Sequence, residues 1–405
     1  MNIIFQAFKR YYSNINPSDL HIIELEKREI ALIPFKEERM IRHISFKDLT
    51  SLKNYLENNV PLHLYYSSAY YGNPQAEDMN AKCWEGADLI FDVDADHIPT
   101  DCKNLHDKWF CLNCNEYGFG VPPEDCPKCK QRKIDVTTWI CEKCLDIAKE
   151  EVLKLIDEYL VPDFGINSKD IEICFSGHRG YHIHIQLEDF RKLSGDGRRE
   201  IADYVRGIGI DLRAHGLRLI NGIVFGPDIR DPGWRGRIAR AFYEYISKSS
   251  IEELEKILGK KAELIISKRE KILDSMMMNG TKWFIPKGIG IKKISKIVEV
   301  AIKRNLCNID ERVTIDIKRL IRYPNSLHGK TGLKVCRLSY SNLNKFDPLK
   351  DAVVFKSGSI KIYVKEVPKI RMEDYELGPI KNEVLEVPES LAIYLICKGA
   401  AEMGK

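Results

Sequence analysis

The 405-residue sequence lacks the features that would place it in a membrane or outside the cell. No run of apolar residues approaches the roughly 20 residues that a transmembrane helix needs. The first residues, MNIIFQAFKRYY, lack the charged, apolar and small-residue regions of a secretory signal peptide, so we expect neither secretion nor a membrane partner. Internal repeats and low-complexity segments are also absent, and a formal net charge of +4 is too small to indicate a nucleic-acid partner by itself.

Cysteine is scarce outside one short segment. Seven of the twelve cysteines lie between Cys102 and Cys144, largely as CxxC pairs, and in a reducing compartment such clustering favours metal binding over disulfides. With His106 they supply enough ligands for two closed, structural zinc sites. We expect an inner, ribbon-like set and an outer set, although the pairs can also be divided differently: Cys111, Cys114, Cys126 and Cys129 inside, and Cys102, His106, Cys141 and Cys144 outside. The lone cysteines are expected to be small core residues: Cys83, Cys174, Cys307, Cys336 and Cys397.

Hydrophobic periodicity predicts a mixed α/β (α+β) fold. An opening helix precedes the β-like runs EIALIPF and LHLYYSSAYY, and the helical pattern CLDIAKEEVLKLIDEYLVPDFG precedes the strands DIEICFSG and YHIHIQL. The 3.6-residue period of helices dominates from about 190 to 305. Strand-like runs such as DAVVFKSGSIKIYV then return before a final helix, PESLAIYLICKGAAEM. We therefore expect an α/β core in three pieces, with a zinc-binding insert and a mainly helical subdomain between them: 1–101, 145–190 and 306–405 for the core, 102–144 for the insert, and 191–305 for the subdomain.

The stretch ADLIFDVDADHIP raises the question of why a buried strand would carry two carboxylates. Side chains two positions apart in a strand share a face, so Leu89, Phe91 and Val93 point one way while Asp92 and Asp94 point the other. Like charges a few ångströms apart raise each other's pKa, and a divalent cation would relieve that cost. A strand with one solvated face explains an isolated DxD pair more simply, so the pair needs support from elsewhere in the chain.

Two further stretches carry basic residues that suit phosphate binding. In FSGHRGYHIHI, Gly177 and Gly180 allow the backbone to approach a ligand, Arg179 offers a fork of donors, and His182 shares a strand face with His184. A structural role for this pair of histidines is the alternative. The stretch VTIDIKRLIRYPNSLHGKTGLKV combines one acid with several bases, or is simply a basic helix end before a hairpin: Asp316, Lys318, Arg319, Arg322, His328 and Lys330.

Three acids and two basic turns are what metal-assisted phosphoryl or nucleotidyl transfer requires. The GKTG sequence lacks the glycine spacing of a P-loop, so we expect no ATPase motif of that kind. Together, FDVDAD, SGHRGYH, VTIDIKRLIRYPNSLHGKTG and the Cys/His segment resemble the catalytic small subunit of archaeo-eukaryotic DNA primases, and the last motif resembles the archaeal branch. The resemblance also extends to FKRYY, LYYSSAYY and ESLAIYLICKGAAE.

This resemblance implies an RRM-like catalytic core with an inserted helical subdomain and a zinc-binding insert. It implies a DNA-templated nucleotidyltransferase that makes short primers for DNA replication by two-metal-ion phosphoryl transfer. The substrates would be ribonucleotides, and whether deoxyribonucleotides are also used stays open. The implied partners are single-stranded DNA template, nucleoside triphosphates and a primase large subunit in a heterodimer. The implied location is the cytoplasm, at replication forks.

The resemblance also implies roles for individual residues. Mg²⁺ or Mn²⁺ would be held by Asp92, Asp94 and Asp316, with Asp96 as a neighbour rather than a ligand. Nucleotide binding would fall to Ser176, Arg179, His182, Arg319, His328 and Lys330. Cys102, His106, Cys141 and Cys144 match the family's structural zinc knuckle. The segment from Cys111 to Cys129, a second zinc site, is an insertion in that knuckle, and its role stays open between binding template and bracing the insert.

Two alternatives remain at this point. A repair polymerase of the same superfamily would carry the same three motifs, although the zinc knuckle favours the replicative enzyme. A non-catalytic, zinc-dependent nucleic-acid-binding module would bind metal without incorporating nucleotides, and it leaves the order and spacing of the three motifs unexplained.

Overall fold

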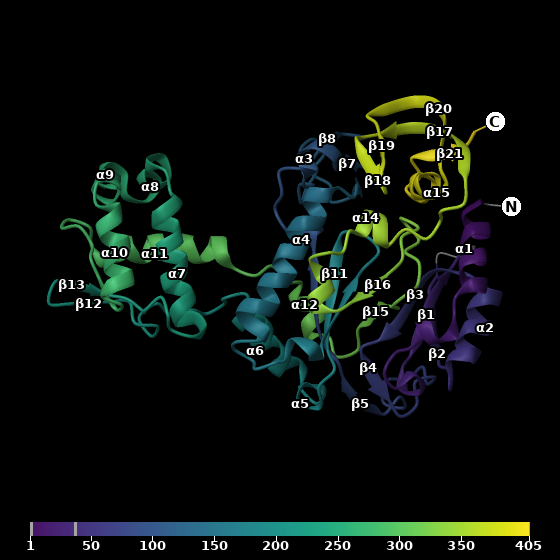
Figure 1. Cartoon of the computed structure of the whole chain (residues 1–405), viewed down its shortest axis with the longest axis horizontal. Coiled ribbons are helices and arrows are strands. Elements are labelled where there is room, and N and C mark those ends of the chain that lie inside the picture. Colours follow the sequence, from purple (N-terminus) through teal and green to yellow (C-terminus); the bar gives the residue numbers. More distant parts are fainter. Residues whose placement is uncertain (1–2, 36–38, 405) are drawn as a thin grey trace. The chain divides into compact units, whose positions relative to one another are not determined.

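The computed structural model describes residues 3–35 and 39–404, and the chain divides into two compact units (Figure 1). Unit 1 comprises Met1–Leu153, Asn167–Glu200 and Asn308–Lys405, and unit 2 comprises Lys154–Ile166 and Ile201–Cys307. Within the described ranges, no helix is long and apolar enough to cross a membrane. Helices and strands are mixed along the chain, which confirms the α+β prediction; the five segment boundaries expected from the sequence stay a prediction.

The sheet that carries the first two motifs has the strand order β16-β10-β11-β6, and its neighbouring strands are antiparallel. Its strands are β6 (Leu89–Asp94), β10 (Ile171–Phe175), β11 (Gly180–Ile185) and β16 (Cys336–Leu338). In β6, Phe91 and Val93 are buried while Asp92 and Asp94 are half-buried, as the alternation predicts. The register pairs His182 of β11 with Asp92 and Gly180 with Asp94, so the histidine lies beside the first carboxylate.

A second antiparallel sheet lies beside the first (Figure 1), and Ile90 of β6 packs in its core. Its order is β15-β3-β1-β2, and its strands are β1 (Ile30–Pro34), β2 (Ile41–Ile44), β3 (Pro61–Ser67) and β15 (Leu320–Arg322). Helices α1 (Ile3–Asn14) and α2 (Leu49–Asn59) contribute one apolar face each to this core. Tyr66 of β3 joins the sheets, because its ring stacks on His184 of β11 with 6.2 Å between ring centroids. Asp48 caps α2 by accepting the Ser51 N–H at 2.8 Å.

A buried ion pair fixes the chain just before β6. Arg28 lies 2.9 Å from Asp88, and both side chains are fully buried. Arg28 also donates to the backbone oxygens of Ser67 and Ser68, and the Tyr70 hydroxyl donates to Asp88 at 2.6 Å. Because these groups satisfy one another in the interior, the network holds the carboxylate-bearing strand in one position.

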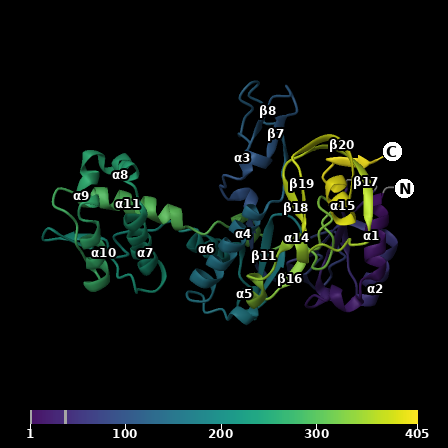
Figure 2. The same ribbon diagram turned by 45° about the horizontal axis from the view of Figure 1, so that its top comes forward.

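The cysteine-rich insert forms its own small sheet. Its elements are α3 (Lys103–His106), β7 (Lys108–Cys111), β8 (Tyr117–Phe119) and β9 (Ile134–Thr137), in the strand order β8-β7-β9. Figure 2 shows this insert extending outward from the rest of unit 1. Helix α4 (Glu142–Leu155) leads from the insert back to the main sheet and lies beside β11 in both views.

The C-terminal part of unit 1 adds two further small sheets around a buried helix. These are β20-β17-β21 and β18-β19, packed with α15 (Glu389–Cys397): β17 (Ser359–Val367), β18 (Ile370–Met372), β19 (Tyr375–Leu377), β20 (Ile380–Pro388) and β21 (Ala401–Met403). The predicted strand DAVVFKSGSIKIYV is wrong in its first half, because residues 352–358 form a loop that buries its apolar side chains without pairing. Cys83 is exposed, so its predicted core position is also wrong, whereas Cys174, Cys307 and Cys336 are buried.

Unit 2 is mainly helical, as the periodicity of its sequence predicts. Its longer helices are α7 (Gly233–Lys248), α8 (Ile251–Leu258), α10 (Arg269–Met278) and α11 (Ile291–Asn305), with α9 (Ala262–Ile266) between them. A small sheet that the sequence did not suggest accompanies them: β12 (Arg218–Ile220), β13 (Ile223–Phe225) and β14 (Lys282–Trp283). Ser250 and Glu253 form a reciprocal capping box that begins α8.

The remaining α-helices and strands lie mainly in unit 1: α5 (Glu188–Arg191), α6 (Gly195–Val205), α12 (Glu311–Ile315), α13 (Tyr340–Leu343), α14 (Pro348–Asp351), β4 (Ala69–Tyr71) and β5 (Trp84–Ala87).

Candidate active site and metal-binding insert

A cavity of about 470 Å³ lies over the carboxylates of β6. It brings together seven of the nine residues predicted for catalysis and nucleotide binding: Asp92, Asp94, Ser176, His182, Arg319, His328 and Lys330. The other two, Arg179 and Asp316, are not among its lining residues. The cavity is also lined by His178, Arg322 and Tyr65, which the sequence reading did not assign to the site.

The two half-buried carboxylates of β6 have raised pKa values. Burial raises the pKa of Asp92 to about 7, and the charges of Asp94 and Asp310 act in the same direction. Burial also raises the pKa of Asp94. His182 Nε2 lies 3.6 Å from Asp92 Oδ1, but burial lowers the pKa of His182 well below its usual value, so this histidine is neutral and supplies no compensating charge. Carboxylate oxygens in this arrangement suit Mg²⁺ or Mn²⁺.

The third carboxylate near this pair is Asp310, and Asp316 is elsewhere. The Asp310 N–H donates to the backbone oxygen of Asp92 at 2.9 Å, and Asp310 caps α12, which packs against β6. Asp316 follows the other end of α12, where it is exposed and accepts the Lys318 N–H at 2.9 Å. The structure therefore does not bring the predicted Asp316 to the pair. The sequence reading began its third motif at Val313 and so missed the earlier acid.

Basic and imidazole groups form a further part of the cavity wall. Arg322 Nη1 lies 2.9 Å from His63 Nδ1, and the ring of His63 meets the edge of His328. His328 in turn stacks on His178 with 5.3 Å between ring centroids. Burial lowers the pKa of His63 to about 3 and that of His178 and His328 well below the usual range, so all three imidazoles are neutral. Positive charge on this wall therefore comes from Arg319, Arg322 and Lys330.

Gly177 joins the two basic turns. Its φ of +79° lies in the left-handed region, and a Cβ built there would lie 2.7 Å from the Cβ of His328. The Thr331 hydroxyl donates to the Gly177 backbone oxygen at 2.6 Å. Only glycine allows the turn before β11 to approach the His328 turn this closely. The close approach predicted for Gly177 is therefore made to another turn of the protein.

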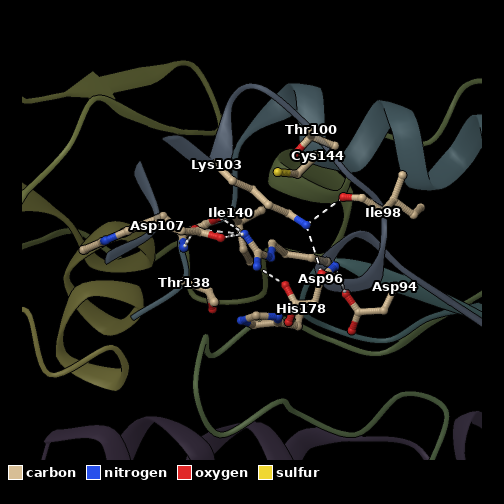
Figure 3. Close-up of polar contacts among 12 residues, drawn as sticks. Asp94, Asp96, Ile98, Thr100, Lys103, Asp107, Thr138, Ile140, Cys144 and His178 are labelled. Carbon is tan, nitrogen blue, oxygen red and sulfur yellow. Dashed lines mark hydrogen bonds and ion pairs between the residues drawn. The ribbon is translucent and has the colours of Figure 1, made fainter. Parts of the chain in front are cut away.

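Arg179 is buried in a cluster of polar side chains and does not line the cavity. Figure 3 shows the polar contacts of this region, including those around Asp96 and Asp107. The Arg179 side chain is 1% exposed, and Nη1 donates to both oxygens of Asp107, at 3.0 and 2.8 Å. The same guanidinium contacts Asp96 and the backbone oxygen of Trp139. His178 lines the cavity, whereas the ion pair with Asp107 holds Arg179 in this buried cluster. The predicted phosphate contact of Arg179 does not match this geometry.

The two cysteine clusters assemble as the spacing predicts. Cys102, His106, Cys141 and Cys144 form one group and Cys111, Cys114, Cys126 and Cys129 the other, with the ligand atoms of each group within 4.8 Å of one another. Four thiolate and imidazole ligands in a closed arrangement suit zinc. The structure thus supports the expected division of the ligands into an outer and an inner set.

A chain of contacts links the outer cluster to the cavity. His106 Nδ1 lies 2.8 Å from Asp107 Oδ1, which leaves Nε2 facing Cys141 at 3.2 Å. A carboxylate behind a ligating histidine fixes the orientation of its ring. Because Asp107 also binds Arg179, and Arg179 binds Asp96, the outer cluster is tied through buried side chains to the turn that follows β6.

Comparisons with known proteins show which family this chain resembles. A family model described as DNA primase small subunit matches residues 133–338. The DNA primase small subunit PriS of Methanothrix thermoacetophila is 35% identical over 414 residues, which cover 94% of this chain and 93% of that protein. PriS of Methanococcoides burtonii is 35% identical over 419 residues, covering 98% and 97%, and PriS of Thermoplasma volcanium is 33% identical over 402 residues, covering 98% and 95%.

Proposed function

The chain belongs to the DNA primase small-subunit family, and from that premise we propose that nucleotides are joined in the cavity over β6, at Asp92 and Asp94 with Asp310 beside them. As a member of this family it is a DNA-directed primase, a nucleotidyltransferase. The observation that carries the proposed location is that Asp92 and Asp94 share one face of β6 and line the cavity, while the Asp310 N–H donates to the Asp92 backbone oxygen. Burial, Asp94 and Asp310 all raise the pKa of the Asp92 carboxyl, and a bound cation would reverse that cost.

Each group of side chains in the cavity has a distinct part in the proposed reaction. When Mg²⁺ or Mn²⁺ is bound, it would activate the attacking hydroxyl and neutralise charge on the leaving pyrophosphate. Arg319, Arg322 and Lys330 would attract and orient the triphosphate of the incoming nucleotide. The neutral imidazoles and the Ser176 hydroxyl would donate uncharged hydrogen bonds to its oxygens. Arg319 and Arg322 lie close enough to Asp92 to act on its pKa, so a triphosphate held by these bases has its reacting phosphate near the carboxylates.

Further parts of the proposal concern the fold, the metals and the partners. The antiparallel sheet β16-β10-β11-β6 with α4 beside it would be the RRM-like catalytic core. Zinc would occupy both cysteine clusters as a structural ion, and the outer one would hold Arg179 and Asp96 in place through His106 and Asp107. Single-stranded DNA, nucleoside triphosphates and a large subunit are the proposed partners, at replication forks in the cytoplasm.

The decisive experiment compares Asp310→Asn with Asp316→Asn, two isosteric changes at opposite ends of one short helix. The assay is incorporation of labelled nucleotides on unprimed single-stranded DNA with Mn²⁺, with Asp92→Asn as the reference for an inactive site. We expect Asp310→Asn to lose about 100-fold or more, since losing even an outer partner of a metal ligand costs about 10–100-fold. Asp316→Asn should stay within a few fold of the parent.

The opposite ranking of the two variants would restore Asp316 as the third ligand. Zinc content and urea unfolding of each variant separate loss of activity from loss of fold. Extension of a primed template without synthesis on the unprimed one would favour the repair-polymerase alternative. A zinc-loaded parent that incorporates nothing, even with a large subunit added, would favour the non-catalytic binding module.

A further inference from the structure

A second cavity, of about 710 Å³, lies between the cysteine-rich insert and the C-terminal sheets of unit 1. We call it the insert groove, and its walls come from α3, β7, β8, the end of β9, β17, β20 and the chain after α15. No residue of the candidate active site described above lines it.

One segment of chain separates the insert groove from the active-site cavity. Val136 and Thr138 line the active-site cavity, whereas Thr137 and Trp139 line the insert groove. This alternation follows from the period of an extended chain, whose successive side chains point to opposite sides. Lys398, which lines the groove, donates to the Thr138 backbone oxygen at 2.7 Å and lies 3.1 Å from His178 Nε2. The two cavities are therefore immediate neighbours.

Positive charge is concentrated along the groove. Among the described residues that line it, one is acidic, Glu366, and five are lysines: Lys108, Lys365, Lys369, Lys381 and Lys398. Burial lowers the pKa of Lys398 to about 7, so the positive charge of the groove comes mainly from the other four lysines. Glu366 is shared, since it lies 3.8 Å from Lys108 and opposite Lys381 in the β17–β20 register. Two of the other lysines pair with glutamates at the margin, Lys365 with Glu402 at 2.6 Å and Lys369 with Glu376 at 2.8 Å. These exposed pairs exchange easily for contacts with an anionic ligand.

Exposed aromatic rings stand beside this charge. Phe119 is 58% exposed and lines the groove, and Tyr117, two residues earlier on β8, is 60% exposed. Lys108 Nζ lies 5.0 Å from the centroid of the Tyr117 ring and 5.9 Å from that of Phe119. Large aromatic side chains normally bury most of their surface, so two exposed rings on one three-residue strand call for a ligand with flat, apolar faces.

We propose that the insert groove binds single-stranded nucleic acid, with phosphates on the lysines and bases stacked on Phe119 and Tyr117, and thereby guides the template strand at the active site. This inference rests on the proposed function: if nucleotides are joined at the carboxylates, the template strand must pass them. The insert groove is the channel next to that cavity. Lysines with exposed rings are the usual combination for sequence-independent binding of single strands. A protein partner is the competing occupant, but an excess of lysine is untypical of the core of a protein interface.

The test measures binding of a fluorescein-labelled oligodeoxythymidylate to the full zinc-loaded chain, without nucleotides, by fluorescence anisotropy. We expect Phe119→Ala and Tyr117→Ala each to weaken affinity roughly 5- to 100-fold, the range for loss of one stacking ring. Lys108→Ala and Lys381→Ala should each reduce the slope of log affinity against log salt by about 0.7, the value for one phosphate contact on a single strand. Tyr375→Ala and Lys350→Ala are matched controls, because both residues are exposed in the same unit and neither lines the groove.

Binding and chemistry are separated by the same set of proteins. If the parent incorporates nucleotides while the groove variants bind oligonucleotide as the parent and the controls do, the groove proposal fails and the proposed function stands. Parent protein that binds no oligonucleotide also overturns the groove proposal. Groove variants that keep DNA affinity but lose association with a purified large subunit identify a protein occupant instead. An inactive parent whose groove variants lose oligonucleotide affinity supports the groove and contradicts the proposed function.

Discussion

Replacing Arg179 by methionine tests whether this residue braces the protein or binds nucleotide. The substitution keeps much of the side-chain volume and removes the charge. Arg179 is 1% exposed and its partner Asp107 has a side chain 4% exposed, so the change leaves a buried carboxylate without its cation. Removing one partner of a buried ion pair typically costs about 3–5 kcal/mol.

The contacts that remain to Asp107 set the expected value within this range. Asp107 keeps the Trp139 N–H at 3.0 Å and the His106 ring at 2.8 Å, whereas Asp96 is half-exposed and can be solvated. We therefore expect Arg179→Met to lower the free energy of unfolding by the lower end of this range, about 3 kcal/mol. With an m-value of about 3 kcal/mol/M, the urea midpoint of the unit that contains Arg179 would fall by about 1 M.

The assay is urea unfolding of the zinc-loaded full chain, with a double-mutant cycle. Asp107→Asn combined with Arg179→Met removes both charges, so the double variant should lose less than the sum of the two single variants. Arg179→Lys should lie between the parent and Arg179→Met, because an ammonium cannot reach both Asp107 oxygens and Asp96 as a planar fork does. An unchanged midpoint together with weaker nucleotide binding would refute this reasoning and restore Arg179 as a phosphate ligand.

Three further predictions concern the metal, a turn and a buried amine. Changing both Cys111 and Cys114 to Ser should release one zinc per chain, measured by metal analysis, and spare basal synthesis; loss of two zincs would contradict the separate clusters. Gly177→Ala should lower the free energy of unfolding by more than the roughly 1 kcal/mol that left-handed strain alone costs, and it should weaken nucleotide binding. Gly222→Ala should show only the strain, because Gly222 has the same φ of +79° but no atom within 4 Å of the added Cβ. Burial lowers the pKa of Lys398 to about 7 from 10.5, so the unfolded chain binds the extra proton between these values. Lys398 therefore lowers the free energy of unfolding increasingly as the pH falls from about 10 to 7, and this effect is complete below pH 7. Lys398→Met should gain stability over the parent across that window in urea titrations, and a pH-independent difference would contradict the assignment.

Local patterns account for what the sequence predicted well. The alternation in ADLIFDVDADHIP placed Asp92 and Asp94 on one face because side-chain direction in a strand depends only on position. The cysteine spacing separated the inner and outer clusters because a CxxC pair brings two ligands together within one turn of chain. The helical period also predicted most of unit 2, where each helix buries one face of its own sequence.

What the sequence did not reveal depends on contacts between distant segments. Whether His178 or Arg179 faces the cavity is decided by Asp107, 72 residues away in the chain, which binds the guanidinium and leaves the imidazole outside. The choice between Asp310 and Asp316 depends on which end of α12 packs against β6. By itself, the sequence determined the chemistry available to this protein: its acids, its basic turns and the eight Cys and His residues that could hold metal. Only the tertiary structure decided which of those groups meet, because burial and long-range pairing, rather than residue type, select the side of a turn or helix that faces the site.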